Sequence, residues 1–246
     1  KSTHEGARIV ITKKPKSIII PIAIASMLCV AVGAVLLLQK PVTERKRQIA
    51  IEGIVSEIRT GQETLIVDPD QCPVEGEGYE EPENILLEEE ITPATFAPEE
   101  EVLSVPDTVT LKAAGTISIS SVDLVLPLWD EAGIVSLRYG AGLYKSSSQP
   151  GENGNVIILG HRMKKYGSLF NRLGEVARDD EIMIRTIDGE TFTYEVTQIY
   201  DSVLPKNLLD YFGSGSDGQA KITLVTCTPT GVGTHRLLVV GQLLSP

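Results

Sequence analysis

The chain has 246 residues, of which 42% are hydrophobic, and a formal net charge of −11. This length and composition are sufficient for one or two domains with an apolar core. The acidic balance argues against nucleic acid as a partner, because nucleic-acid-binding proteins present a basic face. The three cysteines follow no framework spacing, so we predict no disulfide framework, no metal site and no cofactor.

The N-terminal region has the pattern of a membrane anchor. Residues 1–17 are polar and basic, and residues 18–38 carry no charged side chain. An apolar run of this length crosses a bilayer core of about 30 Å as a helix. A cleaved signal peptide is the alternative, but its apolar region spans only about 7–15 residues. We therefore predict an uncleaved transmembrane anchor. Basic residues flank both of its ends, so charge alone leaves the orientation open.

Residues 39–111 are predicted to form a juxtamembrane helix followed by an acidic, proline-rich linker. Apolar side chains recur at helical spacing within residues 42–59, namely Ile51, Ile54, Val55 and Ile58. Residues 60–111 contain no Lys or Arg and abound in Glu, Asp and Pro. Such a segment repels itself and buries little apolar surface. We expect it to act as a stalk, with a flexible cover over a groove as the alternative. The first residue is Lys rather than Met, so we also expect a truncated or processed N-terminus.

Residues 112–246 are predicted to be the folded domain. Short apolar or alternating runs predict strands at residues 116–119, 122–128, 156–159, 180–186, 190–199, 222–225 and 237–240. Asp188-Gly189 predicts a hairpin between two of them. Short helices are predicted within residues 131–139, 168–173 and 205–212, and a loop at residues 140–142. Many short strands with few helices indicate an all-β barrel or sandwich.

Three residue types with reactive side chains lie at the ends of predicted strands. Cys227 follows one buried strand, His161 ends another, and Arg236 begins the strand after the cysteine. A thiol has an unperturbed pKa of about 8.5, so a catalytic thiol needs a base or a cation nearby. If these strand ends share one rim, the three side chains supply a nucleophile, a base and an oxyanion or substrate stabiliser. Thr226 and Thr228 flank the cysteine and are candidates for substrate or oxyanion contacts, in particular through the Thr228 N–H.

Each of these residues also has an ordinary structural interpretation. A lone Cys at a strand end is usually a small buried residue, and a lone His or Arg is usually a hydrogen-bonding or solvated side chain. His235 is a rival base because it is close to Cys227 in the sequence. Neighbouring residues on a strand face opposite ways, so His235 faces away if Arg236 faces the thiol.

Taken together, the motifs resemble a known family. Residues 223–237 contain Thr-Leu-Val-Thr-Cys-Thr-Pro, then Gly-Val and Thr-His-Arg-Leu, and resemble the active-site signature of sortases, the cysteine transpeptidases of Gram-positive surfaces. Residues 155–162, Asn-Val-Ile-Ile-Leu-Gly-His-Arg, resemble the histidine strand of that family. Residues 140–144 and 150–154 add to the likeness, which covers roughly residues 112–246. The spacing from cysteine to arginine resembles the pilin-assembling class C best, with class D as the runner-up.

The resemblance implies a closed eight-stranded β-barrel that lies outside the cell, with residues 1–17 in the cytoplasm and residues 18–38 in the cell membrane. It implies Cys227 as nucleophile, His161 as acid and base, and Arg236 as stabiliser. The implied reaction cuts a Leu-Pro-x-Thr-Gly-like signal of a surface or pilin protein between Thr and Gly through a thioester. An amine then accepts the acyl group, either from a lipid II-type cell-wall precursor or from a pilin lysine.

Two positions depart from the class C pattern. Thr230 stands where an aromatic residue usually follows Cys-Thr-Pro, and Asp70 stands where an aromatic residue usually follows Asp-Pro in the N-terminal lid. Pilus polymerisation and wall anchoring therefore both stay open, as does a lid role for residues 60–111. The competing function is a surface β-barrel binding module without catalytic activity.

Overall fold

The computed structural model describes residues 27, 45–69, 72, 108–213 and 218–244. The predicted cytoplasmic tail, nearly all of the predicted anchor and most of the predicted linker lie outside these residues. Within the described part of the chain, no helix is both long enough and apolar enough to cross a membrane.

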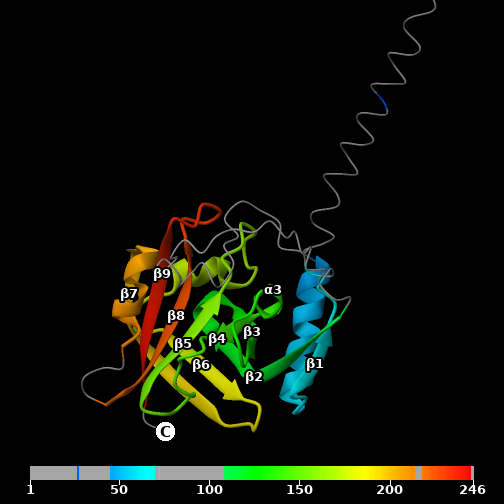
Figure 1. The fold of residues 1–246 in the computed structure, drawn as a ribbon, viewed down its shortest axis with the longest axis horizontal. Helices are drawn as coiled ribbons and strands as arrows, with labels where there is room; N and C mark the ends of the chain where they lie inside the picture. The colour runs from blue at the N-terminus through cyan, green and yellow to red at the C-terminus, as the bar shows by residue number, and fades with distance from the viewer. Residues whose placement is uncertain (1–26, 28–44, 70–71, 73–107, 214–217, 245–246) are drawn as a thin grey trace, which may run out of the picture. The chain divides into compact units, whose positions relative to one another are not determined.

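Eight strands close into a barrel, and a ninth pairs with one of them (Figure 1). The strands are β1 (Thr64–Val67), β2 (Val109–Ile119), β3 (Leu124–Trp129), β4 (Ala141–Leu143), β5 (Gly154–Gly160), β6 (Glu181–Thr186), β7 (Thr191–Val203), β8 (Ala220–Thr228) and β9 (His235–Leu243). The order around the barrel is β2-β3-β4-β5-β8-β9-β7-β6, and pairing of β6 with β2 closes it. The β3–β4 and β5–β8 pairs are parallel, so the sheet is mixed. The predicted eight-stranded barrel is confirmed.

Four short helices connect the described strands: η2 (Ser120–Val122), α3 (Ser136–Tyr139), η3 (Phe170–Glu175) and η4 (Pro205–Tyr211). Three of them fall in or next to the predicted helical segments. Two of those three are 3-10 helices, a form that proteins use in short connecting pieces. The predicted hairpin is also present, since β6 pairs with β7 across the turn that contains Gly189.

The loop predicted at residues 140–142 is wrong, because this segment enters strand β4. It pairs in parallel with β3 and antiparallel with β5. A Cβ on Gly140 would lie 2.4 Å from the Pro127 carbonyl oxygen, and one on Gly142 would lie 2.6 Å from the Ala132 Cα. These glycines therefore mark the close approach of backbones within the fold rather than a turn.

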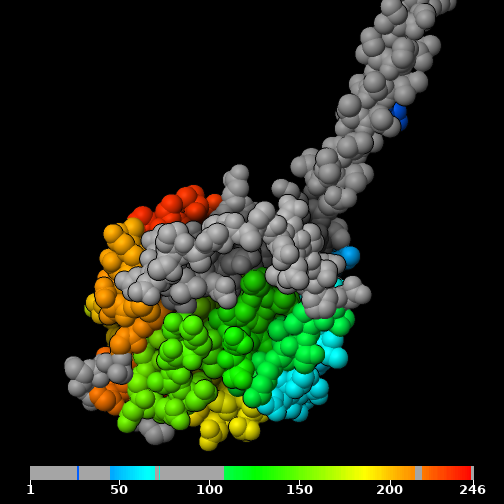
Figure 2. Space-filling view, in the orientation of Figure 1, coloured from blue at the N-terminus to red at the C-terminus, as the bar shows by residue number. Residues whose placement is uncertain are grey.

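The linker predicted over residues 60–111 is structured at both of its described ends. Strand β1 pairs antiparallel with the first residues of β2, with Thr64 opposite Lys112. The helix at residues 45–59 precedes β1 and confirms the predicted amphipathic segment, since Ile51 and Ile58 are buried. Figure 2 shows residues 45–69, in blue to cyan, beside the green start of β2. Ile58 and Leu65 also share an apolar cluster with Trp129 of β3. The folded unit therefore begins well before Lys112.

Strands β5, β8 and β9 separate two apolar clusters, because alternate residues on a strand face opposite sides. Ile158, Leu224 and Val239 face the barrel interior. Their sequence neighbours Leu159, Val225 and Leu238 face outward, where α3 and η4 cover them with apolar residues that include Leu137 and Leu208. This outer face leads to the strand ends that carry the predicted reactive side chains.

Candidate active site

The three predicted catalytic residues lie in one row across neighbouring strands. Strands β5 and β8 are parallel, with Leu159 opposite Val225. When this register is extended by two residues, to the position just after the end of β5, His161 lies level with Cys227. Strands β8 and β9 are antiparallel, and Cys227 lies directly opposite Arg236. Since paired strands lie about 4.8 Å apart, the row brings together residues that are distant in the sequence.

Two hydrogen bonds made by β8 lie on either side of His161 and Cys227, one residue before them and one residue after them. The Thr226 hydroxyl donates to the Gly160 carbonyl oxygen at 2.7 Å. One residue beyond the row, Nη1 of Arg162 donates to the Thr228 hydroxyl at 3.1 Å. The alignment of β5 with β8 therefore continues past the last residue of β5. Thr226, predicted as a substrate or oxyanion contact, is buried and directs its hydroxyl to this strand pairing.

The row lies on the outer face of the barrel. Each residue of the row is two positions along its strand from an outward-facing residue, so it faces the same way. Those outward-facing residues are Leu159, Val225 and Leu238. His235 pairs with Thr228 and therefore faces the other side of the sheet, where its Nδ1 is 3.0 Å from the Thr234 hydroxyl. The structure thus sets His161, rather than His235, on the face of the thiol.

His161 is held firmly in a dry environment. Its carbonyl oxygen accepts a hydrogen bond from the Phe170 N–H at 3.0 Å. Gly160 allows the Phe170 ring to pack beneath the strand end, since a Cβ there would lie 2.5 Å from the ring. Burial, together with the nearby positive charges of Arg138 and Arg47, lowers the pKa of His161 to about 4. The imidazole is therefore neutral near pH 7 and able to accept a proton.

This depressed pKa predicts a pH dependence of stability. Between pH 6.5 and about 4 the unfolded chain binds a proton at this histidine, whereas the folded chain does not. The free energy of unfolding should therefore fall as the pH is lowered through this window, by a total on the order of 3 kcal/mol. Thermal melts of wild type and His161→Gln at each pH measure the effect. The variant should lose this part of the pH dependence, and parallel curves would contradict the prediction.

Arg236 is buried at the base of the loop that joins β8 to β9. Its Nη1 donates to the Gly233 carbonyl oxygen at 2.6 Å and to the His235 carbonyl oxygen at 3.1 Å. The loop is compact, because the Pro229 carbonyl oxygen accepts the N–H groups of both Val232 and Gly233. Cys227 is partly exposed between this arginine and His161. The arrangement sets a fixed cation beside a thiol that solvent can reach.

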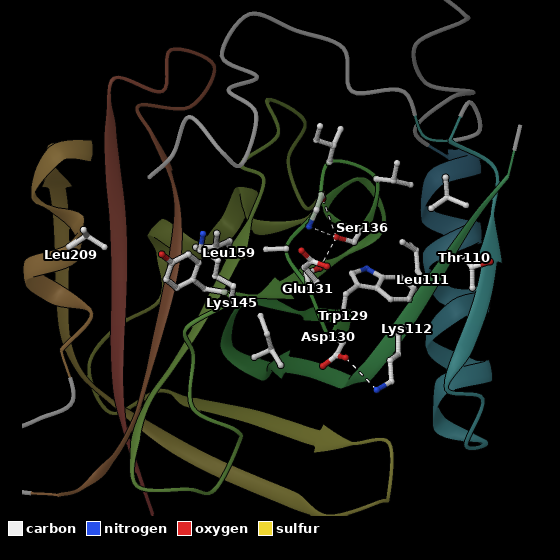
Figure 3. Close-up of a pocket in the computed structure, with 17 residues that line it drawn as sticks. Thr110, Leu111, Lys112, Trp129, Asp130, Glu131, Ser136, Lys145, Leu159 and Leu209 are labelled. Carbon is white, nitrogen blue, oxygen red and sulfur yellow. Dashed lines mark hydrogen bonds and ion pairs between the residues drawn. The ribbon is translucent and has the colours of Figure 1, made fainter. Parts of the chain in front are cut away.

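A cavity of about 950 Å³ adjoins the outer face of the barrel. Leu159 lines it from β5, two residues before His161 and on the same face, and Leu209 lines it from η4 (Figure 3). Other walls come from Ile134, Val135 and Tyr144 near α3 and β4. A largely apolar cavity of this size accommodates a short peptide segment.

Three cations near this site were not predicted from the sequence. Arg138 and Arg47 act on His161, and Arg162 acts on Cys227, through their charges. Arg162 is next to His161 in the sequence, so its position near the site could have been inferred from the sequence. Arg47 and Arg138 come from distant helices and have no local signal. Within the described ranges, no three His, Cys, Asp or Glu side chains gather in a group suited to a metal ion.

Comparison with known proteins identifies the fold. The profile of the sortase domain matches residues 117–244. Sortase D of Bacillus subtilis is 35% identical over 92 residues, which are 37% of this chain and 44% of that protein. Sortase A of Bacillus anthracis is 32% identical over 130 residues, which are 53% of this chain and 59% of that protein. The chain thus spans about half the length of these curated relatives.

A solved sortase structure is also similar to this chain. The complex of Streptococcus agalactiae sortase C1 with MTSET matches with a TM-score of 0.50 and 29% identity, covering 55% of this chain and 70% of that one. The relatives carry the names sortase A, C1 and D, so the comparisons do not select one class. The match over residues 117–244, on an eight-stranded mixed barrel, shows that the chain belongs to the sortase family.

Proposed function

We propose that this protein is a cysteine transpeptidase that cleaves a Leu-Pro-x-Thr-Gly-like sorting signal between Thr and Gly. The observation that carries the proposal is the row of His161, Cys227 and Arg236 across β5, β8 and β9. A thiol, a neutral imidazole and a buried guanidinium on one face are the groups that acyl transfer through a thioester requires.

In the proposed reaction, His161 accepts the proton of the Cys227 thiol as the sulfur attacks the Thr carbonyl carbon of the substrate. Arg236 and the Thr228 N–H stabilise the negative charge that develops on the carbonyl oxygen. The Thr–Gly bond then breaks, and the His161 imidazolium returns the proton to the leaving amine. An acceptor amine then attacks the thioester carbon and gives a proton to His161. The carbon–sulfur bond breaks, and the leaving Cys227 sulfur takes the proton back from His161 as a thiol. We propose that Thr226 acts indirectly, by holding the two strands in register.

The apolar cavity beside the row is the proposed site for the N-terminal part of the sorting signal. Leu159 connects the cavity to the row, since it precedes His161 by two residues on the same face. The leucine and proline side chains of the signal are apolar, as are several of the cavity walls. A peptide in the cavity therefore reaches the row with its following residues.

This placement predicts the effect of a charge in the cavity. Leu209 is 54% exposed, so Leu209→Asp should leave the fold intact. Loss of its apolar contact should raise KM for a sorting peptide about tenfold, with kcat within about twofold of wild type. Met183→Asp is the matched control, since Met183 is 40% exposed on β6 and does not line the cavity. Equal KM changes in the two variants would contradict the assignment of the cavity.

The proposed cellular setting follows from the N-terminal sequence and the family. We propose residues 1–17 as a cytoplasmic tail, residues 18–38 as a single transmembrane anchor, and an extracellular catalytic unit. The proposed partners are surface or pilin proteins with sorting signals. The proposed acceptor is a lipid II-type cell-wall amine or a pilin lysine. The class C spacing of Cys227 and Arg236 favours the pilin lysine, whereas Thr230 favours wall anchoring.

Incubation of the protein with a quenched Leu-Pro-x-Thr-Gly peptide and a nucleophilic amine tests the proposal. We expect cleavage between Thr and Gly, a product that carries the added amine, and an acyl group on the enzyme detected by mass spectrometry. Peptide binding without cleavage over the full pH range of stability would instead favour the binding module.

A further inference from the structure

Arg162 joins three segments around the row. It directly follows His161, and its side chain lies on the opposite face of the sheet. Nη1 donates to the Thr228 hydroxyl at 3.1 Å, and Nε donates to the Asn171 carbonyl oxygen at 3.4 Å. One guanidinium therefore connects the end of β5, helix η3 and the residue after the nucleophile Cys227.

The surroundings of Arg162 hold its side chain in this position. Asn171 is itself fixed, since its Nδ2 donates to the Met163 carbonyl oxygen at 2.6 Å and its Oδ1 accepts the Gly167 N–H at 3.2 Å. Gly174 leaves space for the guanidinium, because a Cβ there would lie 2.5 Å from Nη2 of Arg162. A planar group with several donors suits such a bridge better than a flexible lysine does.

The charge of Arg162 also acts on the nucleophile. Burial lowers the pKa of Arg162, while the negative charges of the Cys227 thiolate and of Asp201 oppose this shift. The guanidinium stays protonated near pH 7, because its ordinary pKa is far higher. Since the interaction is mutual, the cation favours the thiolate form of Cys227. It does so from the face opposite to His161 and Arg236.

We propose that Arg162 is a positioning residue of the active site, which fixes the main chain at Thr228 and holds a positive charge near Cys227. The inference deepens the proposed transpeptidase function and rests on it for the reaction step. The Thr228 N–H is the proposed oxyanion donor, so its direction matters for the rate. Arg162 holds the Thr228 hydroxyl, and a small displacement there misaligns the N–H while the cavity stays unchanged.

Steady-state kinetics of Arg162→Gln, Thr228→Val and their double variant test the positioning role. We expect each single variant to lower kcat by about tenfold to a hundredfold, with KM within about twofold of wild type. The double variant should be no slower than the slower single variant, because both remove one contact. Thr228→Ser keeps the hydroxyl and should retain most of the rate. Arg172→Gln is the matched control, since Arg172 lies on η3 but bonds Asp123 and Glu175 instead.

The pH dependence of Cys227 alkylation by iodoacetamide tests the electrostatic role without any peptide. The midpoint should be higher in Arg162→Gln than in wild type, and Arg162→Lys should return it toward the wild-type value.

If Arg162→Gln does not fold, as shown by a thermal melt, Arg162→Lys and Thr228→Val still decide the kinetic question. An unchanged midpoint, kcat within twofold of wild type, or effects that multiply in the double variant would overturn the proposal. If wild type cleaves no peptide, the proposed function fails, but the alkylation curves still report on Arg162.

Discussion

Replacement of Cys227 with alanine is expected to remove all transfer of the sorting peptide to an amine. Cys227 lies level with His161 and opposite Arg236, so it is the proposed nucleophile of this row. Without it no thioester forms, and the rate should fall by at least about a thousandfold. Fluorescence of the quenched peptide, together with mass analysis of the enzyme for the acyl adduct, measures the loss.

Cys72→Ala is the matched control for this prediction. Cys72 is the other cysteine in the described part of the chain, and it is buried in the apolar cluster that contains Trp129 and Tyr139. Its removal should leave the transfer reaction and the acyl adduct in place. Residual transfer by Cys227→Ala at more than a few per cent of wild type would remove the transpeptidase proposal.

The second large effect is expected from His161→Ala, which should lower kcat by at least about a hundredfold. His161 is the imidazole on the face of the thiol, and its low pKa keeps it neutral and able to accept a proton near pH 7. His235→Ala should keep kcat within a few-fold of wild type, because His235 is paired with Thr228 on the other face. Steady-state kinetics at pH 7 compare the two variants.

A pH series separates a lost base from a lost fold. Wild-type activity should persist as the pH is lowered toward 5, because His161 is still mostly neutral one pH unit above its pKa of about 4. A variant that melts at the wild-type temperature but is inactive at every pH has lost proton transfer rather than its fold. The reverse ranking, with His235→Ala inactive and His161→Ala active, would reassign the base to His235.

Local sequence patterns were sufficient to predict most of the strands and short helices of the described domain. Alternating and apolar runs predicted the central strands, and Asp188-Gly189 predicted the hairpin between β6 and β7. The same approach missed β4, because its glycines are typical of loops when seen alone. Only the packed structure shows that Gly140 and Gly142 lie against Pro127 and Ala132, where a Cβ would not fit.

Strand β1 was missed for a related reason. Its four residues lie at the start of an acidic, proline-rich stretch, and so short a strand has too little periodicity to stand out. Its partner in β2 lies 42 to 48 residues later, with Val67 opposite Val109 and Thr64 opposite Lys112. Such a pairing depends on contacts between distant segments, which a local pattern does not contain.

The sequence by itself determined the family, because the long motifs around Cys227, His161 and Arg236 are specific. It also predicted the chemistry of these three side chains. The tertiary structure alone decided how these groups meet. The parallel pairing of β5 with β8 sets His161 level with Cys227, and the antiparallel pairing with β9 sets Arg236 opposite the thiol. It also decided the environment, since burial and two arginines from distant helices keep His161 neutral. Register and burial arise from the whole fold, so no local stretch of the chain contains them.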